Sequence, residues 1–294
     1  MEFLETIING LSLGGVYALI ALGYTMVYGI AKMLNFAHGD IIMVGGYTIY
    51  LFLTINTFRV NPLVAIACAV VVCCALGIII EKLAYKPLRG ASPLAVLITA
   101  IGVSYFLQSI SQIAFGSDPK TVVILENSGV VNIGSLSISI ISLITLGVSA
   151  AIMAALTLFI RFSKTGRAMI AVSEDRGAAQ LMGVNVNMII TITFAIGSIL
   201  AAVASTFYLL KYPSISNTMG SMPGIKAFTA AVIGGIGSIP GAMIGGILLG
   251  VIECVFTSIP SVAPFTDAIE FGILILLLLV KPNGVLGKLK REKV

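Results

Sequence analysis

Nine apolar runs follow one another along this chain, with polar segments between them. They cover about residues 7–30, 41–55, 63–80, 94–115, 138–160, 188–210, 225–236, 242–258 and 268–280. A helix of about 20 residues spans the ~30 Å hydrocarbon core of a bilayer. The runs are continuous rather than alternating, which excludes a transmembrane β-barrel. The pattern predicts an all-α polytopic membrane protein with about nine transmembrane segments, some of them short or broken.

Composition favours the same class of protein. Of the 294 residues, 58% are hydrophobic and 10% are charged, whereas soluble domains carry about 25% charged residues. The formal net charge of +5 does not indicate a nucleic-acid partner, because the basic residues lie in loops between apolar runs. We expect residues 1–294 to form one transmembrane domain in contact with a lipid bilayer.

Residues 161–187 are the longest polar interruption of the apolar pattern. Their charged residues are Arg161, Lys164, Arg167, Glu174, Asp175 and Arg176. A basic loop flanked by spans is expected on the cytosolic side. The pattern also predicts two short helices, the first capped by Thr165 and the second by Ser173, with Gly183 ending the second in a left-handed turn.

Ala178, Leu181 and Met182 fall on one face of the second predicted helix, and we call these three residues the apolar knob. The segment can be a solvated connecting loop. It can also be a docking element that presents the knob to a soluble partner, which is the interpretation we prefer.

Basic residues favour one orientation. If all nine runs cross with residues 161–187 inside, thirteen basic residues lie inside and four outside, the four being Arg59, Lys120, Lys211 and Lys226. This asymmetry predicts an outer N-terminus and a cytoplasmic C-terminus. Each half of the chain also has a glycine-rich break, at 35–46 and at 234–246, as in transporters built from two pseudo-symmetric halves.

Polar residues near membrane depth are candidates for a translocation path, because they are costly there. Asn35, His38 and Asp40 can line such a path or can cap and pack a helix start. Glu253 and Glu270 can be gate or proton-relay groups, or carboxylates paired with another helix. The glycines favour close helix packing. The candidate path residues are Asn35, His38, Asp40, Gly45, Gly46, Gly234, Gly235 and Glu253.

No motif supports covalent chemistry. The chain has no GxxxxGK[ST] phosphate loop and no Ser/His/Asp or Cys/His arrangement, so we predict neither an enzyme nor catalytic residues. The single histidine and the cysteines, which lie within apolar runs, do not support a metal site.

Three segments carry a resemblance to a known family: NGLSLGGVYALIALGYTMVYGIAKMLNFAHGD, GRAMIAVSEDRGAAQLMGVNV and AAVIGGIGSIPGAMIGGILLGVIE. Together they resemble the LivH-type permease subunits of branched-chain amino acid ABC importers, over nearly the whole chain. The AAQLMGVNV portion is also similar to vitamin B12 and siderophore permeases, which implies a type II ABC importer-like fold.

The resemblance implies an ATP-driven importer of Leu, Ile or Val in the bacterial plasma membrane. Its partners would be a second, LivM-like permease, two cytoplasmic ATP-binding cassette subunits and an extracytoplasmic substrate-binding protein. The chain itself would need no cofactor, because its partners bind and hydrolyse ATP. The implied coupling segment has its candidate residues at Arg167, Glu174, Asp175, Arg176, Ala178, Leu181, Met182 and Gly183.

The residues alone leave other interpretations open. Urea, amide and other amino-acid systems have similar subunits, so the same architecture can serve other cargo. An ion-coupled secondary transporter would depend on intramembrane acids and would work without an ATPase. A membrane scaffold would produce no vectorial flux.

Overall fold

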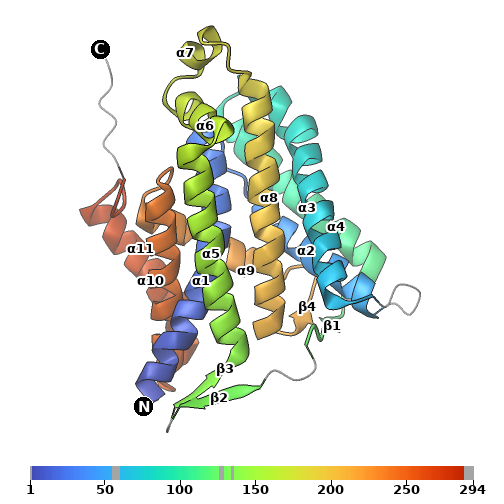
Figure 1. Cartoon of the computed structure of the whole chain (residues 1–294), viewed down its shortest axis with the longest axis vertical. Helices are drawn as coiled ribbons and strands as arrows, with labels where there is room; N and C mark the ends of the chain where they lie inside the picture. The colour runs from blue at the N-terminus through green and yellow to red at the C-terminus, as the bar shows by residue number, and fades with distance from the viewer. Residues whose placement is uncertain (1, 55–59, 126–128, 134–135, 288–294) are drawn as a thin grey trace.

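The computed structural model describes residues 2–54, 60–125, 129–133 and 136–287, and helices dominate it (Figure 1). The nine apolar runs all form α-helices, with ends within about five residues of the expected ones, because a helix satisfies its own backbone groups in lipid. The helices in the described part are α1 (Glu2–Ala31), α2 (His38–Thr54), α3 (Pro62–Ile80), α4 (Pro93–Phe115), α5 (Ile140–Phe162), α6 (Lys164–Glu174), α7 (Arg176–Leu181), α8 (Val186–Lys211), α9 (Ser221–Gly234), α10 (Ile239–Thr257) and α11 (Thr266–Val280). A π-helical turn (Glu81–Tyr85) and a 3₁₀ turn (Lys86–Leu88) extend α3 toward α4, and another 3₁₀ turn (Ala263–Phe265) precedes α11.

Seven stretches among the described residues are long and apolar enough to cross a membrane. They are Phe3–Ala31, Pro62–Leu88, Pro93–Phe115, Ile140–Phe162, Val186–Lys211, Ile239–Thr257 and Ala263–Val280. The other two apolar helices are shorter, with 17 residues in α2 and 14 in α9. At 1.5 Å per residue α9 is about 21 Å long, which is less than a bilayer core. The seven spans therefore do not confirm the predicted count of nine crossings.

The bundle has two distinct ends (Figure 1). At one end α5 leads into α6 and α7, and α8 begins there; we call this the α6–α7 end. At the other, the hairpin end, β2 (Val130–Ile133) pairs antiparallel with β3 (Leu136–Ser139). There β1 (Lys120–Thr121) also pairs with β4 (Ser214–Ile215). The polar stretch between α4 and α5 thus holds strands.

The first helix, α1, lies at the centre of the bundle and packs along α10, α8, α9 and α5. Small residues allow this close packing. A Cβ atom at Gly14 would lie 2.7 Å from the Cα of Ile247 in α10, closer than real Cβ atoms come. The close helix contact predicted for the glycines of the first apolar run is confirmed.

Two short helices, α2 and α9, begin inside the bundle and meet there. Residues 32–37 lead from α1 to α2, and His38 packs on Gly23, about two turns before the end of α1. Residues 212–220 lead from the hairpin end to α9. A Cβ atom at Gly39 would lie 2.5 Å from the carbonyl oxygen of Gly220, so the two helix starts are in backbone contact. From this point α2 runs toward the hairpin end and α9 toward the α6–α7 end (Figure 1).

The two glycine-rich breaks have different structures. The first, 35–46, includes the linker before α2 and the start of that helix. The second, 234–246, is the turn between α9 and α10, where Gly235 and Gly237 adopt positive φ of 104° and 91°. The second break does not meet the first one. The start of α2 meets the start of α9 near Gly220.

Candidate functional site

Helix α6 forms where the chain turns sharply after α5. The Ser163 hydroxyl accepts a hydrogen bond from the Gly166 N–H at 2.8 Å, which caps the helix. Gly166 is required there because a Cβ atom would collide with the backbone of Ile160. Met169 and Val172 are buried and fix α6 to the bundle. The prediction of a helix is confirmed, but the predicted cap at Thr165 is wrong, because the turn places Ser163 at the first free N–H groups.

Helix α7 follows at once and carries the apolar knob. Its cap is Asp175, whose carboxylate accepts from the Ala178 N–H at 3.0 Å, so the predicted cap at Ser173 is wrong. Ser173 instead donates to the Ile170 carbonyl within α6. Gly183 ends the segment with a φ of +84°, as predicted.

The apolar knob faces outward. Leu181 is 90% exposed and Met182 is 84% exposed, and Ala178 beside them is also exposed. Ala179, on the other side of α7, is buried against the bundle. Two large apolar side chains held this far out on a short helix are the kind of surface that a partner covers.

Arg176 connects α7 to the central helix α1. Its guanidinium donates to the carbonyl oxygens of Ile30, at 3.2 Å, and of Ala31, which end α1. These are carbonyl groups that a helix end leaves without a backbone partner. Burial lowers the pKa of Arg176, and the positive charge of Arg89 lowers it further. Arg176 therefore joins α7 directly to the end of α1.

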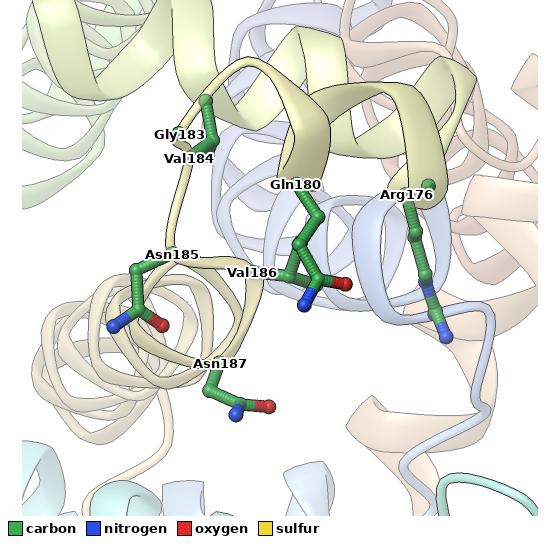
Figure 2. Close-up of a pocket in the computed structure, with 8 residues that line it drawn as sticks. Arg176, Gln180, Gly183, Val184, Asn185, Val186 and Asn187 are labelled. Carbon is green, nitrogen blue, oxygen red and sulfur yellow. The ribbon is translucent and has the colours of Figure 1, made fainter.

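An open notch of about 510 Å³ separates α7 from the start of α8 (Figure 2). Arg176, Gln180 and Asn187 extend their polar side chains along it. Gly183–Asn185 form the connecting loop, and Val186 and Asn187 begin α8. The remaining predicted coupling residues, Arg167 and Glu174, lie on α6. The structure thus places all eight candidate coupling residues on one projection at the α6–α7 end.

A polar cluster beside this projection was not predicted from the sequence. Arg89 donates to the carboxylate of Glu81 and to the side-chain oxygen of Asn187. Thr191 donates to the other Glu81 oxygen at 2.8 Å. The cluster ties the turn after α3 to the start of α8. Only the charged residues of the segment EKLAYKPLR hinted at it, since the partners are about 100 residues away in the chain.

The candidate path residues of the first half gather around the start of α2. Asn35 is buried and accepts a hydrogen bond from the Tyr85 hydroxyl at 2.8 Å. His38 is buried against α1 and α8, and its ring packs edge-on against Tyr24. Asp40 accepts from the Gln108 amide at 2.8 Å.

The Asp40 contact brings three helices together. The same Gln108 nitrogen lies 3.3 Å from the Ser104 hydroxyl and 3.5 Å from the Ser221 hydroxyl. Asp40 is on α2, Gln108 and Ser104 are on α4, and Ser221 begins α9. Carboxylate, amide and hydroxyl groups therefore converge where the two short helices start. Asp40 was predicted from the sequence, whereas Gln108 and the two serines were not.

The candidate glycines pack helices. Gly45 and Gly46 lie against Ser205 of α8, and Gly46 also faces Ile215 of β4. Gly234 and Gly235 pack at the α6–α7 end, where Gly235 lies against Gly287. These contacts are the close helix and turn packing that the sequence favoured for the glycines.

Glu253 joins an ion cluster, which agrees with the alternative in which Glu253 and Glu270 pair with another helix; their partner Lys226 was not predicted. The Lys226 ammonium lies 3.0 Å from Glu253, 2.8 Å from Asp267 and 3.3 Å from Glu270. Lys226 is 6% exposed and lies on the second turn of α9. Its predicted place in an outer loop was therefore wrong: a lysine with three carboxylates around it can stay inside a helix bundle.

These features define a class of protein: a multi-pass helical membrane protein with a polar junction inside the bundle and an exposed apolar projection at one end. Comparison with known proteins then identifies the family. Residues 6–279 match the model described as branched-chain amino acid transport system / permease component. The chain belongs to this family.

The sequences of similar proteins align with nearly all of this chain. The high-affinity branched-chain amino acid transport system permease protein BraD of Pseudomonas aeruginosa is 43% identical, over 100% of this chain and 98% of the relative. LivH of Escherichia coli K12, which has the same descriptive name, matches at the same identity and coverage. A probable branched-chain amino acid transport permease protein LivH of Methanocaldococcus jannaschii is 30% identical over 93% of this chain and 90% of its own length. Among solved structures, PsaBC from Streptococcus pneumoniae in complex with Fab aligns over 96% of this chain and 93% of that chain, with a TM-score of 0.48 and 14% identity.

Proposed function

We propose that this chain is the membrane permease subunit of an ATP-driven importer for the branched-chain amino acids Leu, Ile and Val. The family and the names of the full-length relatives support the substrate class. The observation that carries the mechanism is the exposed apolar knob on α7, joined through Arg176 to the end of α1.

The α6–α7 end is the proposed cytosolic end, with the N-terminus outside and the C-terminus inside. Basic residues concentrated at a membrane-flanking end favour the cytosol. At the hairpin end, the described elements carry Lys120 and Lys211. The α6–α7 end carries many more basic residues: Lys32, Lys82, Lys86, Arg89, Arg161, Lys164, Arg167, Arg176 and Lys281.

In this proposal two cytoplasmic ATP-binding subunits dock on residues 161–187 of this permease and of a second, LivM-like permease. The knob would enter an apolar groove of the ATPase. Closure of the ATPases would then move α7, and Arg176 would pass the displacement to α1 and to the linker before α2. The chain itself performs no covalent chemistry and needs no cofactor, because ATP is bound and hydrolysed by its partners.

The proposed path passes the junction of α2, α4 and α9. Two helix N-termini meet there, and helix N-termini in broken membrane helices favour anionic substrate groups. Asp40 would face the ammonium group of an amino acid, while Asn35 and His38 hold the start of α2. A binding protein on the hairpin end would deliver the cargo and supply most of the selectivity.

Replacing Leu181 with Asp tests the docking role. The charge would sit in the apolar groove of the ATPase, so uptake should be lost while membrane insertion and permease folding stay normal, since Leu181 is 90% exposed. Leu181→Met is the matched control and should transport normally. Normal leucine uptake by Leu181→Asp in proteoliposomes that contain the complete importer would refute the docking role.

One observation favours a different class, an ion-coupled secondary transporter. Buried carboxylate oxygens of Glu253 and Glu270 have no hydrogen-bond partner among the described residues. That class predicts uptake by the permease in liposomes without an ATPase, driven by an ion gradient. The ATP-driven importer predicts none. Urea or amide cargo is separated from Leu, Ile and Val by ligand identification on the co-purified binding protein.

A further inference from the structure

A cavity of about 550 Å³ lies at the α6–α7 end, next to α7 but separate from the notch of Figure 2. Its walls come from the end of α1 and the linker that follows, the turn before α4, the first turns of α4, and Arg176 of α7. Most lining residues are apolar. The charged ones are Lys32, Arg89 and Arg176, and the described part of the chain contributes no acidic residue to the lining. A cavity of this size holds a small organic group.

The three cations create a site for an anion. Glu81 is the one carboxylate paired with Arg89 among the described residues, and Arg176 gives its N–H groups to carbonyl oxygens rather than to a carboxylate. The buried Nε of Arg89 has no hydrogen-bond partner within the described part of the chain. The lowered pKa of Arg176, caused by burial and then by Arg89, fits two guanidinium groups that repel each other. An oxyanion that accepts from both would relieve this repulsion.

The position of the cavity indicates where the anion comes from. Three candidate spans, Phe3–Ala31, Pro62–Leu88 and Pro93–Phe115, all have an end at its wall. It therefore lies at the level where lipid headgroups meet the helices. Its apolar wall continues onto the outer face of α4, where Leu94 is 63% exposed, Ile98 61% and Tyr105 66%. An anion with acyl chains can occupy the cavity and this face together.

We propose that the cavity binds the phosphate-bearing headgroup of an anionic phospholipid, with its acyl chains along α4. Basic pockets at the ends of membrane helices have this chemistry. Lys32, Arg89 and Arg176 donate to the phosphate oxygens. Because Arg176 belongs to α7 and the others to the bundle, the lipid ties the proposed coupling projection to the membrane domain. Free phosphate shares the headgroup chemistry but gains nothing from α4.

Native mass spectrometry of the full-length, delipidated permease tests this proposal without depending on transport. The protein is titrated with dioleoyl phosphatidylglycerol, with dioleoyl phosphatidylcholine, and with inorganic phosphate. We expect one phosphatidylglycerol to be retained at concentrations where phosphatidylcholine and phosphate are not. Lys32→Gln should weaken that binding by about fivefold, the contribution of one basic residue near an anionic surface.

Two further variants separate the cavity from general surface charge. Ala91→Trp fills the cavity and leaves every charge in place, so it should abolish the tight site. Lys82→Gln is the matched control, because Lys82 is exposed on the π-helical turn Glu81–Tyr85 and does not line the cavity; it should bind like the wild type. Equal retention of the two lipids, wild-type binding by Ala91→Trp, or tight binding of phosphate alone would each overturn the proposal.

Discussion

Replacing Lys226 with Met should strongly destabilise the helix bundle. The lysine side chain is 7% exposed and lies within 3.3 Å of three carboxylates, of which Glu270 is fully buried and Asp267 is about half exposed. Methionine has a similar volume, so packing is preserved while the buried carboxylates lose their cation. Removing one partner of a buried ion pair costs about 3–5 kcal/mol.

The cluster also predicts an asymmetry. With an effective dielectric constant near 20, Glu270 gains about 5 kcal/mol from Lys226 at 3.3 Å. Glu253 and Asp267 contact the same ammonium and repel Glu270, which offsets part of this attraction. Glu270→Gln should therefore lower the free energy of unfolding by less than Lys226→Met does, and added to Lys226→Met it should recover part of the loss.

The assay is unfolding of the purified permease in mixed micelles with sodium dodecyl sulfate, followed by circular dichroism. Lys211→Met is the matched control, since Lys211 is a half-buried lysine near the hairpin end whose ammonium lies 3.9 Å from the Cys254 sulfur. Unfolding of Lys226→Met at the same detergent fraction as Lys211→Met would refute the role of the cation. A loss in Glu270→Gln as large as that in Lys226→Met would refute the predicted asymmetry.

Two other changes probe the connections around the path and the projection. Asp175→Ala removes the α7 cap and should destabilise this helix by about 1 kcal/mol. Amide hydrogen exchange should become faster in residues 176–182 and stay unchanged in α8. Unchanged exchange in α7 would contradict the capping role. Tyr85→Phe leaves the buried Asn35 oxygen without its donor and should lower the free energy of unfolding by about 1–3 kcal/mol. The same detergent titration measures this change. An unchanged unfolding free energy would contradict a stabilising role of the Tyr85–Asn35 hydrogen bond.

The helices of this fold were predictable because a continuous apolar run in lipid must satisfy its backbone N–H and C=O groups within itself, as an α-helix does. The projection was predictable because residues 161–187 are too polar to enter the membrane. The caps were not. Serine, threonine and aspartate stand close together in this segment, and the tight contact of Gly166 with Ile160 decides that Ser163 takes the cap of α6.

The interior polar groups were the least predictable part of the molecule. Lys226 looked like a loop residue because its three carboxylates lie 27 to 44 positions later, on α10 and at the start of α11. Gln108 was unremarked in α4 until the fold brought it to Asp40, which is 68 positions earlier. Hydropathy reports the cost of a polar side chain in a membrane, and only the helix arrangement reveals which partner offsets that cost.

Docking of the apolar knob on an ATPase can be detected by photo-cross-linking. A photoreactive amino acid is placed at Leu181 in the complete importer, and in a second sample at Val130, which is 55% exposed at the hairpin end. We predict that position 181 captures the ATP-binding subunit and that position 130 does not. Capture of that subunit from position 130, or none from position 181 in an importer that hydrolyses ATP, would contradict this docking.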